Sequence, residues 1–478
     1  MQVLRNLIGG RWRESAETRE ILNPSDPATP VGRFHVAGPD DVADAVAAAR
    51  AALPAWAWAP PAARGAVLAK AAAELRARAD ELGRLLSDEE GKTLAEGVGE
   101  VRRAADILDY YAQEAYRPTG ELLASSRPGV EVEVRHHPVG VVGVITPWNF
   151  PIAIPAWKIA PALAYGNAVV VKPAEQAPAS TWHLVDVLHR AGVPAGVLNL
   201  TIGPGSAVGA AMAEHEGIDG LTFTGSTPVG RRLAGQLASR LAKVQLELGG
   251  KNALVVLDDA DLDTAVECAL QGAYGSTGQR CTASSRLVVT RGIHDRFVEA
   301  LAARLRSLRL GTATDPEAFY GPVASRDQLE QDLSYVEVGE AEGATALVRG
   351  EAWDDDGPRV LGPTLFVGGR NDMRIAQEEI FGPVAVAIEV DDLDEALSVV
   401  NDSQYGLVAS VVTRSLAAAD RFKREAQVGM TMVNLPTAGQ EYHAPFGGAK
   451  ASSYGPREQG RAAREFFTES RTSYVRAG

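Results

Sequence analysis

Short apolar runs alternate with helix-like stretches along most of this 478-residue chain, and this alternation limits the possible folds more than any other feature. A first series comprises residues 139–145, 168–171, 197–202, 221–224 and 244–248, and a second comprises residues 254–257, 287–290, 384–388, 408–412 and 431–434. Apolar strands separated by helices form parallel sheets that are covered on both faces. We therefore predict two α/β domains, the first a Rossmann-like layer, with Gly249 and Gly250 as the hinge between them.

The first third of the chain is predicted to be mainly helical. Ala-rich and periodic stretches predict helices at about residues 40–53, 62–86 and 93–116. At residues 129–135, valines alternate with charged residues, which is the pattern of a strand with one wet face. We expect that strand at a sheet edge or an interface.

Composition and charge exclude several classes of protein. The 46% hydrophobic and 23% charged residues are typical of a soluble globular protein, and the net charge of −14 disfavours nucleic acid as a partner. The amino terminus lacks the apolar core of a signal peptide, and three prolines interrupt the uncharged run at residues 138–157, so neither secretion nor a membrane helix is expected. Two cysteines, Cys268 and Cys281, indicate a reducing, cytoplasmic setting.

Two well-known binding signatures are missing from the sequence. There is no Cys-x-x-Cys and no His-x-x-x-His pair, so no metal site is predicted. Gly91, Lys92 and Thr93 end like a phosphate loop, but Leu86 stands where the first glycine belongs.

Two glycine-rich turns lie where a predicted strand gives way to a helix: residues 203–205 followed by Gly209, and residues 223–226 followed by Gly230. Backbone amides at such a helix start can hold a phosphate, although most glycines of this kind only make turns. Lys172 ends another strand, and Glu175 follows at a distance suited to a ribose, where a carboxylate would favour NAD over NADP. A solvated ion pair is the alternative for these two residues.

Three residues are candidates for covalent chemistry. Cys268 has the sequence context of a helix-packing residue, whereas Cys281 lies in a polar, glycine-containing segment that would give a nucleophile access. Glu247 is a carboxylate inside an apolar strand, where burial would raise its pKa toward that of a general base. Asn149, on a proline-bracketed turn, could donate to an oxyanion or could simply satisfy the turn.

Seven stretches together resemble the aldehyde dehydrogenase superfamily, in order and over essentially the whole chain. They are residues 146–151 (Thr-Pro-Trp-Asn-Phe-Pro), 172–175 (Lys-Pro-Ala-Glu), 223–227 (Phe-Thr-Gly-Ser-Thr), 246–251 (Leu-Glu-Leu-Gly-Gly-Lys), 278–281 (Gly-Gln-Arg-Cys), 378–383 (Glu-Glu-Ile-Phe-Gly-Pro) and 445–448 (Pro-Phe-Gly-Gly). The resemblance implies a Rossmann-like NAD-binding domain of residues 1–117 and 139–248, a catalytic α/β domain of residues 249–445, and a small β oligomerisation arm of residues 118–138 and 459–478. It also implies a homodimer or homotetramer.

The resemblance further implies a role for individual residues. Cys281 would be the nucleophile, Glu247 the general base and Asn149 half of the oxyanion hole, with Lys158 in the catalytic surroundings. The cofactor would be NAD, with NADP possible, bound by Thr146, Pro147, Trp148, Lys172, Glu175, Gly205, Phe223, Gly225, Ser226, Glu379 and Phe381. A thiolate would add to the aldehyde, the adduct would lose hydride to leave a thioester, and water would release a carboxylic acid.

The substrate is suggested by the carboxyl-terminal part of the chain. Residues 436–446 and 452–460 resemble the subgroup of this family that oxidises 2-oxoglutarate semialdehyde, an anionic aldehyde that needs a cation in its channel. The resemblance places six residues around the substrate: Arg103, Phe150, Trp157, Arg280, Gln440 and Phe446. Each arginine could instead form a structural ion pair.

Other functions remain open on the sequence alone. The enzyme could act on succinate semialdehyde or on a neutral aliphatic aldehyde. A non-catalytic protein could keep the same scaffold, although intact Cys281, Glu247 and Asn149 argue against it. A coenzyme-A-acylating variant is less favoured, because Glu247 is the water-activating group that such an enzyme can dispense with.

Overall fold

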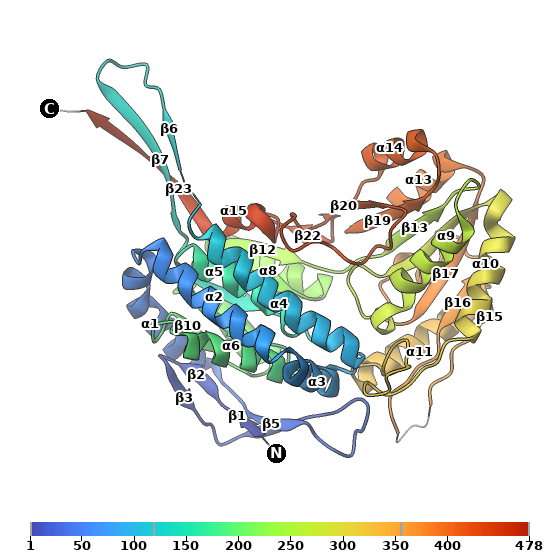
Figure 1. Ribbon diagram of the computed structural model, residues 1–478, viewed down its shortest axis with the longest axis horizontal. Coiled ribbons are helices and arrows are strands. Elements are labelled where there is room, and N and C mark those ends of the chain that lie inside the picture. Colours follow the sequence, from blue (N-terminus) through green and yellow to red (C-terminus); the bar gives the residue numbers. More distant parts are fainter. Residues whose placement is uncertain (1, 118–119, 354–356, 477–478) are drawn as a thin grey trace.

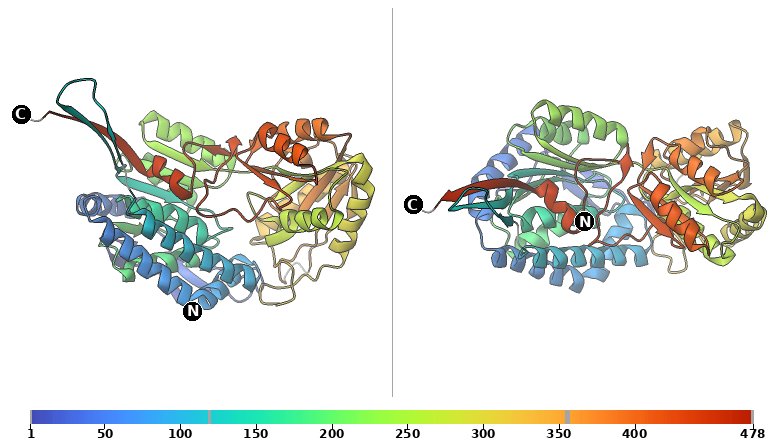
Figure 2. Two further views of the ribbon diagram at one scale, coloured as in Figure 1. Left: turned by 45° about the horizontal axis from the view of Figure 1, so that its top comes forward. Right: turned by 90° about the horizontal axis from the view of Figure 1, so that it is seen from above.

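The structure is a computed structural model that describes residues 2–117, 120–353 and 357–476. Figure 1 shows two α/β bodies and a narrow arm that projects from the first body, on the side away from the second. The same arrangement is visible from two other sides in Figure 2. Parts of the predicted domains lie outside the described residues, namely Met1, residues 118–119, residues 354–356 and residues 477–478.

The first body is built on an eight-stranded sheet with the order β22-β12-β11-β8-β9-β10-β2-β3. Five parallel strands at its centre confirm the first predicted series: β8 (Val141–Ile145), β9 (Ala168–Lys172), β10 (Leu198–Leu200), β11 (Gly220–Thr224) and β12 (Lys243–Glu247). Antiparallel strands extend it at the two edges: β2 (Asn6–Ile8) and β3 (Arg11–Arg13) at one, β22 (Ser453–Tyr454) at the other. Strands of two or three residues are too short to give a periodic signal in the sequence.

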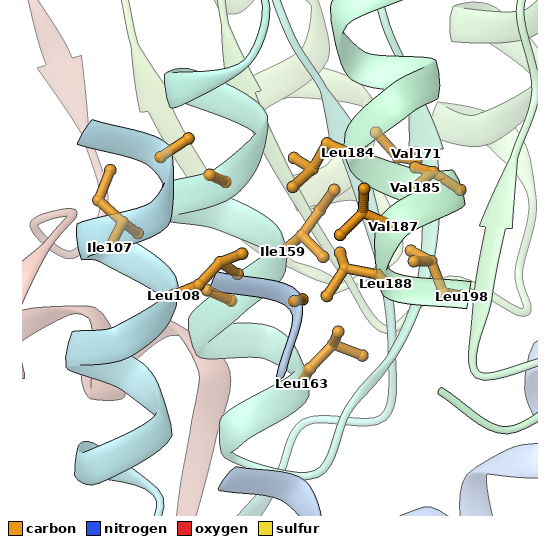
Figure 3. Close-up of a cluster of buried hydrophobic side chains, with 14 of the residues drawn as sticks. Ile107, Leu108, Ile159, Leu163, Val171, Leu184, Val185, Val187, Leu188 and Leu198 are labelled. Carbon is orange, nitrogen blue, oxygen red and sulfur yellow. The ribbon is translucent and has the colours of Figure 1, made fainter. Parts of the chain in front are cut away.

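Helices cover both faces of this sheet, because successive side chains of a strand point to opposite sides. One face carries α2 (Pro61–Ala77), α3 (Ala79–Glu90), α4 (Leu94–Glu114), α5 (Ala153–Ala164) and α6 (Pro178–Ala191); the other carries α1 (Pro39–Ala57), α7 (Ala210–Glu214) and α8 (Thr227–Ser239). Figure 3 shows part of the first layer, where Leu108 of α4, Ile159 of α5 and Leu188 of α6 belong to one buried cluster with Val171 of the sheet. Each such buried side chain stabilises the fold by about 1.5–3 kcal/mol.

The helix predicted over residues 62–86 is in fact two helices, which is a correction to the sequence prediction. Arg78 separates α2 from α3 with a φ of −105° and a ψ of 16°. Its guanidinium forms charged hydrogen bonds with Glu74 before the break and with Glu81 after it, and these bonds stabilise the break. The change of direction lets α2 and α3 both pack against α4.

The second body is built on a seven-stranded sheet with the order β15-β16-β17-β14-β13-β19-β20. Its strands are β13 (Asn252–Val256), β14 (Ser284–Thr290), β15 (Thr345–Val348), β16 (Thr364–Val367), β17 (Val384–Val390), β19 (Val408–Val412) and β20 (Met430–Val433). All pairs are parallel except β15 with β16. The second predicted series is confirmed; β15 and β16 are additional strands at one edge.

Helices again cover both faces of the second sheet. One face packs on α9 (Leu262–Ala269) and α10 (Arg291–Arg306), and the other on α11 (Arg326–Ala341), α12 (Arg374–Gln377), α13 (Leu393–Asn401) and α14 (Leu416–Glu425). The short helices η2 (Leu270–Tyr274) and η3 (Gly275–Gly278) follow α9 and lead into β14.

The arm is a three-stranded sheet with the order β23-β7-β6. Its strands are β6 (Gly120–Leu123), β7 (Val130–Pro138) and β23 (Thr468–Arg476). The alternating valine strand is therefore the central strand of the arm and not an edge strand, because β6 and β23 pair with its two sides. A further small sheet, β1-β5-β4, is formed near the amino terminus by β1 (Gln2–Leu4), β4 (Thr18–Ile21) and β5 (Gly32–His35).

The chain passes from the first body to the second after β12 and returns after β20. On its return β21 (Ala449–Lys450) pairs with β18 (Tyr405–Gly406), and β22 pairs with β12. The helices η4 (Gly460–Ala463) and α15 (Arg464–Phe467) then join the core of the first body. Within the described residues no helix is long and apolar enough to cross a membrane; the uncharged run at residues 138–157 forms β8, a turn and the start of α5.

Candidate active site

The carboxyl ends of four parallel strands carry candidate residues at one edge of the first sheet. Asn149 follows β8, Lys172 ends β9, Gly225 and Ser226 follow β11, and Glu247 ends β12. Ligands of parallel α/β sheets bind at this edge, because the loops there converge in space.

Cys281 lies just after a strained turn. Ser276 and Thr277 in η3 have φ angles of 51° and 59°, which non-glycine residues rarely adopt. The segment is fixed from outside: Thr277 Oγ1 donates to the carbonyl of Gly321 at 3.0 Å, and the carbonyl of Cys281 accepts from Asn252 Nδ2 at 2.8 Å. The position of the thiol is therefore set by the loop before α11, which contains Gly321, and by strand β13, which begins at Asn252.

Cys281 lines two cavities at once. The arginine cavity, of about 380 Å³, contains all six residues that the resemblance placed around the substrate: Arg103, Phe150, Trp157, Arg280, Gln440 and Phe446. The glycine cavity, of about 220 Å³, contains Pro147, Trp148, Asn149, Gly225, Ser226, Glu379 and Phe381. Cys281 therefore lies between the two cavities.

A third cavity, of about 420 Å³, contains Lys172, Gly205 and Phe223 and is called the lysine cavity here. Gly205 begins the π-helix η1 (Gly205–Gly209), which leads into α7, so this glycine turn lies at the strand-to-helix junction predicted for it. Four predicted residues line none of the three cavities: Thr146, Lys158, Glu175 and Glu247. Thr146 and Lys158 are buried.

The Asn149 turn is held by a buried charged network. Asn149 Nδ2 donates to the backbone carbonyl of Gln279 at 3.0 Å. The backbone carbonyl of Asn149 accepts a hydrogen bond from Lys92 Nζ at 2.7 Å. Lys92 also donates to Glu100 at 2.7 Å, and the other oxygen of Glu100 accepts the amides of Ile152 and Ala153 at 3.1 Å each. The turn before α5 is thus fixed by Glu100 of α4 and by Lys92, which precedes that helix, with one amide hydrogen of Asn149 left for another acceptor.

Glu247 is fully buried, and its two oxygens differ. Oε2 accepts from Ser453 Oγ on β22 at 2.6 Å, whereas Oε1 has no hydrogen-bond partner among the described residues. Burial, together with the nearby charge of Glu458, raises the pKa of Glu247 well above its usual value. Glu458 itself forms an ion pair with Lys158 and accepts from Trp157 Nε1 at 2.7 Å.

Within the part of the chain that the structure describes, no cation is among the groups that act most strongly on the thiol of Cys281. Burial and the carboxylates of Glu379 and Glu247 raise its pKa above the usual value for cysteine. The guanidinium of Arg280 instead bonds to Ser276 Oγ at 2.7 Å and to Glu96 at 3.2 Å. The paired guanidinium of Arg280 therefore does not stabilise the thiolate of Cys281.

The two arginines of the arginine cavity have different partners. Arg280 is paired with Glu96, while Arg103 donates to the backbone carbonyl of Gln440, and no carboxylate among the described residues is within ion-pair distance of Arg103. Burial lowers the pKa of Arg103, but a guanidinium stays charged at neutral pH. Arg103 is thus a charged group with unused donors at the wall of the cavity.

The lysine and glycine cavities hold groups suited to a dinucleotide. Lys172 donates to the carbonyls of Pro173 and Gly203 at 2.7 and 3.1 Å, and burial lowers its pKa to about 8. Burial raises the pKa of Glu379 to about 7, and one of its oxygens accepts the amide of Gly250 at 2.8 Å. Among the described residues no group of three or more histidine, cysteine or acidic side chains is arranged to hold a metal ion.

Comparison with known proteins settles the family. The model of the aldehyde dehydrogenase family matches residues 12–473. The chain belongs to the aldehyde dehydrogenase family. It is therefore an oxidoreductase that acts on aldehydes, and the family predicted from the seven stretches is confirmed.

Individual aldehyde dehydrogenases are similar over nearly their whole length. The chain is 44% identical over 476 residues to the alpha-ketoglutaric semialdehyde dehydrogenase of Bacillus subtilis and to the alpha-ketoglutarate semialdehyde dehydrogenase of Haloferax volcanii, covering 98% of both chains in each case. A crystal structure of betaine aldehyde dehydrogenase from Staphylococcus aureus in complex with NAD+ superposes with a TM-score of 0.96 at 35% identity, covering 99% of this chain and 94% of that one. The predicted α/β fold class is confirmed.

Several buried charges at this aldehyde dehydrogenase site were not predicted from the sequence. Lys92 and Glu100 hold the Asn149 turn, and Glu458 lies beneath Glu247 with Lys158. One signal could have indicated them: the chain has only eight lysines, so Lys92, Lys158 and Lys172 are each unusual where an arginine would be expected.

Proposed function

We propose that this aldehyde dehydrogenase oxidises 2-oxoglutarate semialdehyde to 2-oxoglutarate, with NAD or NADP as the oxidant. The observation that carries the proposal is the position of Cys281, which opens to the arginine cavity on one side and to the glycine cavity on the other. The names of the two relatives at 44% identity support the same substrate.

Cys281 is the proposed nucleophile. After the thiol has lost its proton to solvent, the thiolate adds to the aldehyde carbon, and the electron pair of the carbonyl double bond moves to the oxygen, which becomes an oxyanion. The free amide hydrogen of Asn149 and the backbone amide of Cys281 are proposed to bind that oxygen. A well-placed donor of this kind contributes about 3 kcal/mol to the transition state.

The next steps need a base and water. A bound nicotinamide ring would supply the acceptor for the hydride that the tetrahedral adduct on Cys281 has to lose. Cys281 is then left as a thioester, and Glu247 is proposed to take a proton from the water that attacks it. The unpartnered Oε1 of Glu247 supports this role, with Ser453 holding the other oxygen and Lys158 keeping Glu458 paired below it.

The residues of the two remaining cavities fit a nicotinamide dinucleotide. At the glycine cavity, Thr224 Oγ1 is buried and has no hydrogen-bond partner among the described residues. A β-carbon at position 249 would lie 2.4 Å from a carboxylate oxygen of Glu379, so the glycine at this position keeps space in the cavity. The nicotinamide half is proposed to lie by Thr146, Pro147, Trp148, Glu379 and Phe381, the pyrophosphate by Gly225 and Ser226, and the adenosine half by Lys172, Glu175, Gly205 and Phe223.

The charge of the substrate separates this proposal from other members of the family. Arg103 would bind the distal carboxylate of an anionic semialdehyde, with Arg280 beside it and Phe150, Trp157, Gln440 and Phe446 as the other walls. Betaine aldehyde carries a positive charge, which the guanidinium of Arg103 would repel. An anionic substrate is therefore favoured.

A substrate panel tests this proposal. We expect kcat/KM for 2-oxoglutarate semialdehyde to exceed that for propionaldehyde and for betaine aldehyde by at least about 10²-fold, as one charge-assisted contact of about 3 kcal/mol would give. Arg103→Gln should remove most of this preference through KM while leaving propionaldehyde turnover unchanged. Equal kcat/KM for the neutral and anionic aldehydes in the wild-type enzyme would exclude the arginine anchor.

We also propose the domain division and assembly that the family resemblance implied. The change of sheet after β12 supports a first domain of residues 1–117 and 139–248 and a second of residues 249–445.

The arm exposes apolar side chains, including Leu122 at 81% and Tyr474 at 63%, which supports burial against a second copy in a homodimer or homotetramer. The two free cysteines agree with a cytoplasmic location.

A further inference from the structure

An arginine from the amino-terminal sheet reaches the corner of the site where the adenosine ribose is proposed to bind. Arg19, on β4, donates from Nη1 to Glu175 Oε1 at 2.8 Å, although the two residues are 156 positions apart. Its Nε donates to Glu17 at 2.8 Å, while its Nη2 makes no hydrogen bond among the described residues. One guanidinium is therefore shared between two carboxylates and keeps unused donors.

This ion pair changes what Glu175 can do. A free carboxylate at this position accepts from both ribose hydroxyls and repels a 2′-phosphate. An arginine on the same carboxylate offsets its charge and competes for its lone pairs. The planar fork of a guanidinium also matches the oxygens of a phosphate.

The side chains are placed so that they can rearrange. Arg19 is 45% exposed and Glu175 is 29% exposed, so neither is locked in the core. An exposed pair of this kind contributes little to stability, and its partners can be exchanged at small cost. A 2′-phosphate could therefore replace Glu175 as a partner of Arg19 without unfolding any element.

We propose that Arg19 is a specificity-determining residue that lets the enzyme bind NADP with an affinity close to that for NAD. The inference rests on the proposed dinucleotide site. It assigns to β4, outside the Rossmann-like sheet, a direct role in recognising the 2′-position of the cofactor.

Binding of cofactor fragments tests this without turnover. Calorimetry with 5′-AMP and 2′,5′-ADP gives the ratio of their dissociation constants, and we expect the two to agree within about tenfold in the wild-type enzyme. In Arg19→Ala the dissociation constant of 2′,5′-ADP should rise about fivefold to tenfold, while that of 5′-AMP stays the same or falls, because Glu175 is freed for the ribose.

Two further variants test whether Arg19 itself controls the affinity for 2′,5′-ADP. Glu17→Gln removes the second carboxylate from Arg19 and should tighten 2′,5′-ADP about threefold. Arg33→Ala is the matched control: Arg33 lies on neighbouring β5, is similarly exposed and faces Glu20 at 3.9 Å, so the ratio should not change. An unchanged ratio in Arg19→Ala, with 5′-AMP still bound, overturns the inference alone. Failure of 5′-AMP to bind the wild-type enzyme overturns the proposed dinucleotide site as well.

Discussion

Cys281→Ala is expected to lower kcat for aldehyde oxidation at least about 10⁴-fold, because no covalent adduct can form without the sulfur. Of the described residues that line both the arginine cavity and the glycine cavity, only Cys281 has a side chain that can attack a carbonyl and later leave. Cofactor binding should persist, since alanine leaves both cavities open. Reduced cofactor formed under saturating aldehyde measures the loss, and calorimetry with 5′-AMP measures binding.

The chain provides a matched control in its second cysteine. Cys268 is buried in α9, and burial raises the pKa of its thiol to about 11, so Cys268→Ala should keep activity within about twofold of the wild-type enzyme. Near-normal turnover by Cys281→Ala would assign the nucleophile to another residue. Melting curves of both variants check that neither result comes from unfolding.

Glu247→Gln is expected to leave the first turnover almost intact and to slow thioester hydrolysis about 10²- to 10⁴-fold, the usual contribution of a general base. The glutamine amide can still hydrogen-bond with Ser453, so the local packing is kept. Rapid-quench mass spectrometry should then find the acyl group on the peptide that contains Cys281. A variant that shows no burst and no acyl-enzyme would falsify the assignment of the base.

The same residue predicts a pH dependence. Because burial raises the pKa of Glu247, its basic form is scarce at low pH and becomes more populated as pH rises. Hydrolysis of the thioester by the wild-type enzyme should accelerate with pH through that raised pKa, and Glu247→Gln should lose this dependence. Glu465→Gln, an exposed change on α15, is the control that should keep the wild-type profile.

The parallel sheets could be predicted from the sequence because their central strands are buried on both faces. Runs such as residues 168–171 and 408–412 consist almost entirely of apolar residues, which leaves few other structures for them. The edge strands β2, β3 and β22 are two or three residues long and partly polar, so no pattern identifies them. The break at Arg78 could not be predicted either, because apolar residues continue at helical spacing on both sides of it.

Some residues of the candidate site could be predicted from the sequence and others could not, and the difference has a physical reason. Residues in local motifs, such as Cys281 and Asn149, are identified by their neighbours in the sequence. Residues that act through distant partners carry no such signal: Glu458 is 300 positions from its partner Lys158, and Lys92 reaches Asn149 from the short connection between α3 and α4. Arg19 belongs to this second kind, since only the fold brings it to Glu175.

The pairing of β22 with β12 has a consequence for biosynthesis. Glu247 is translated 206 positions before Ser453, whose hydroxyl orients it, and also well before Glu458, the carboxylate below it. Until the ribosome has added these two residues, the nascent protein already contains Cys281 but lacks the groups that arrange its base. The enzyme therefore stays catalytically immature until Ser453 and Glu458 have been synthesised.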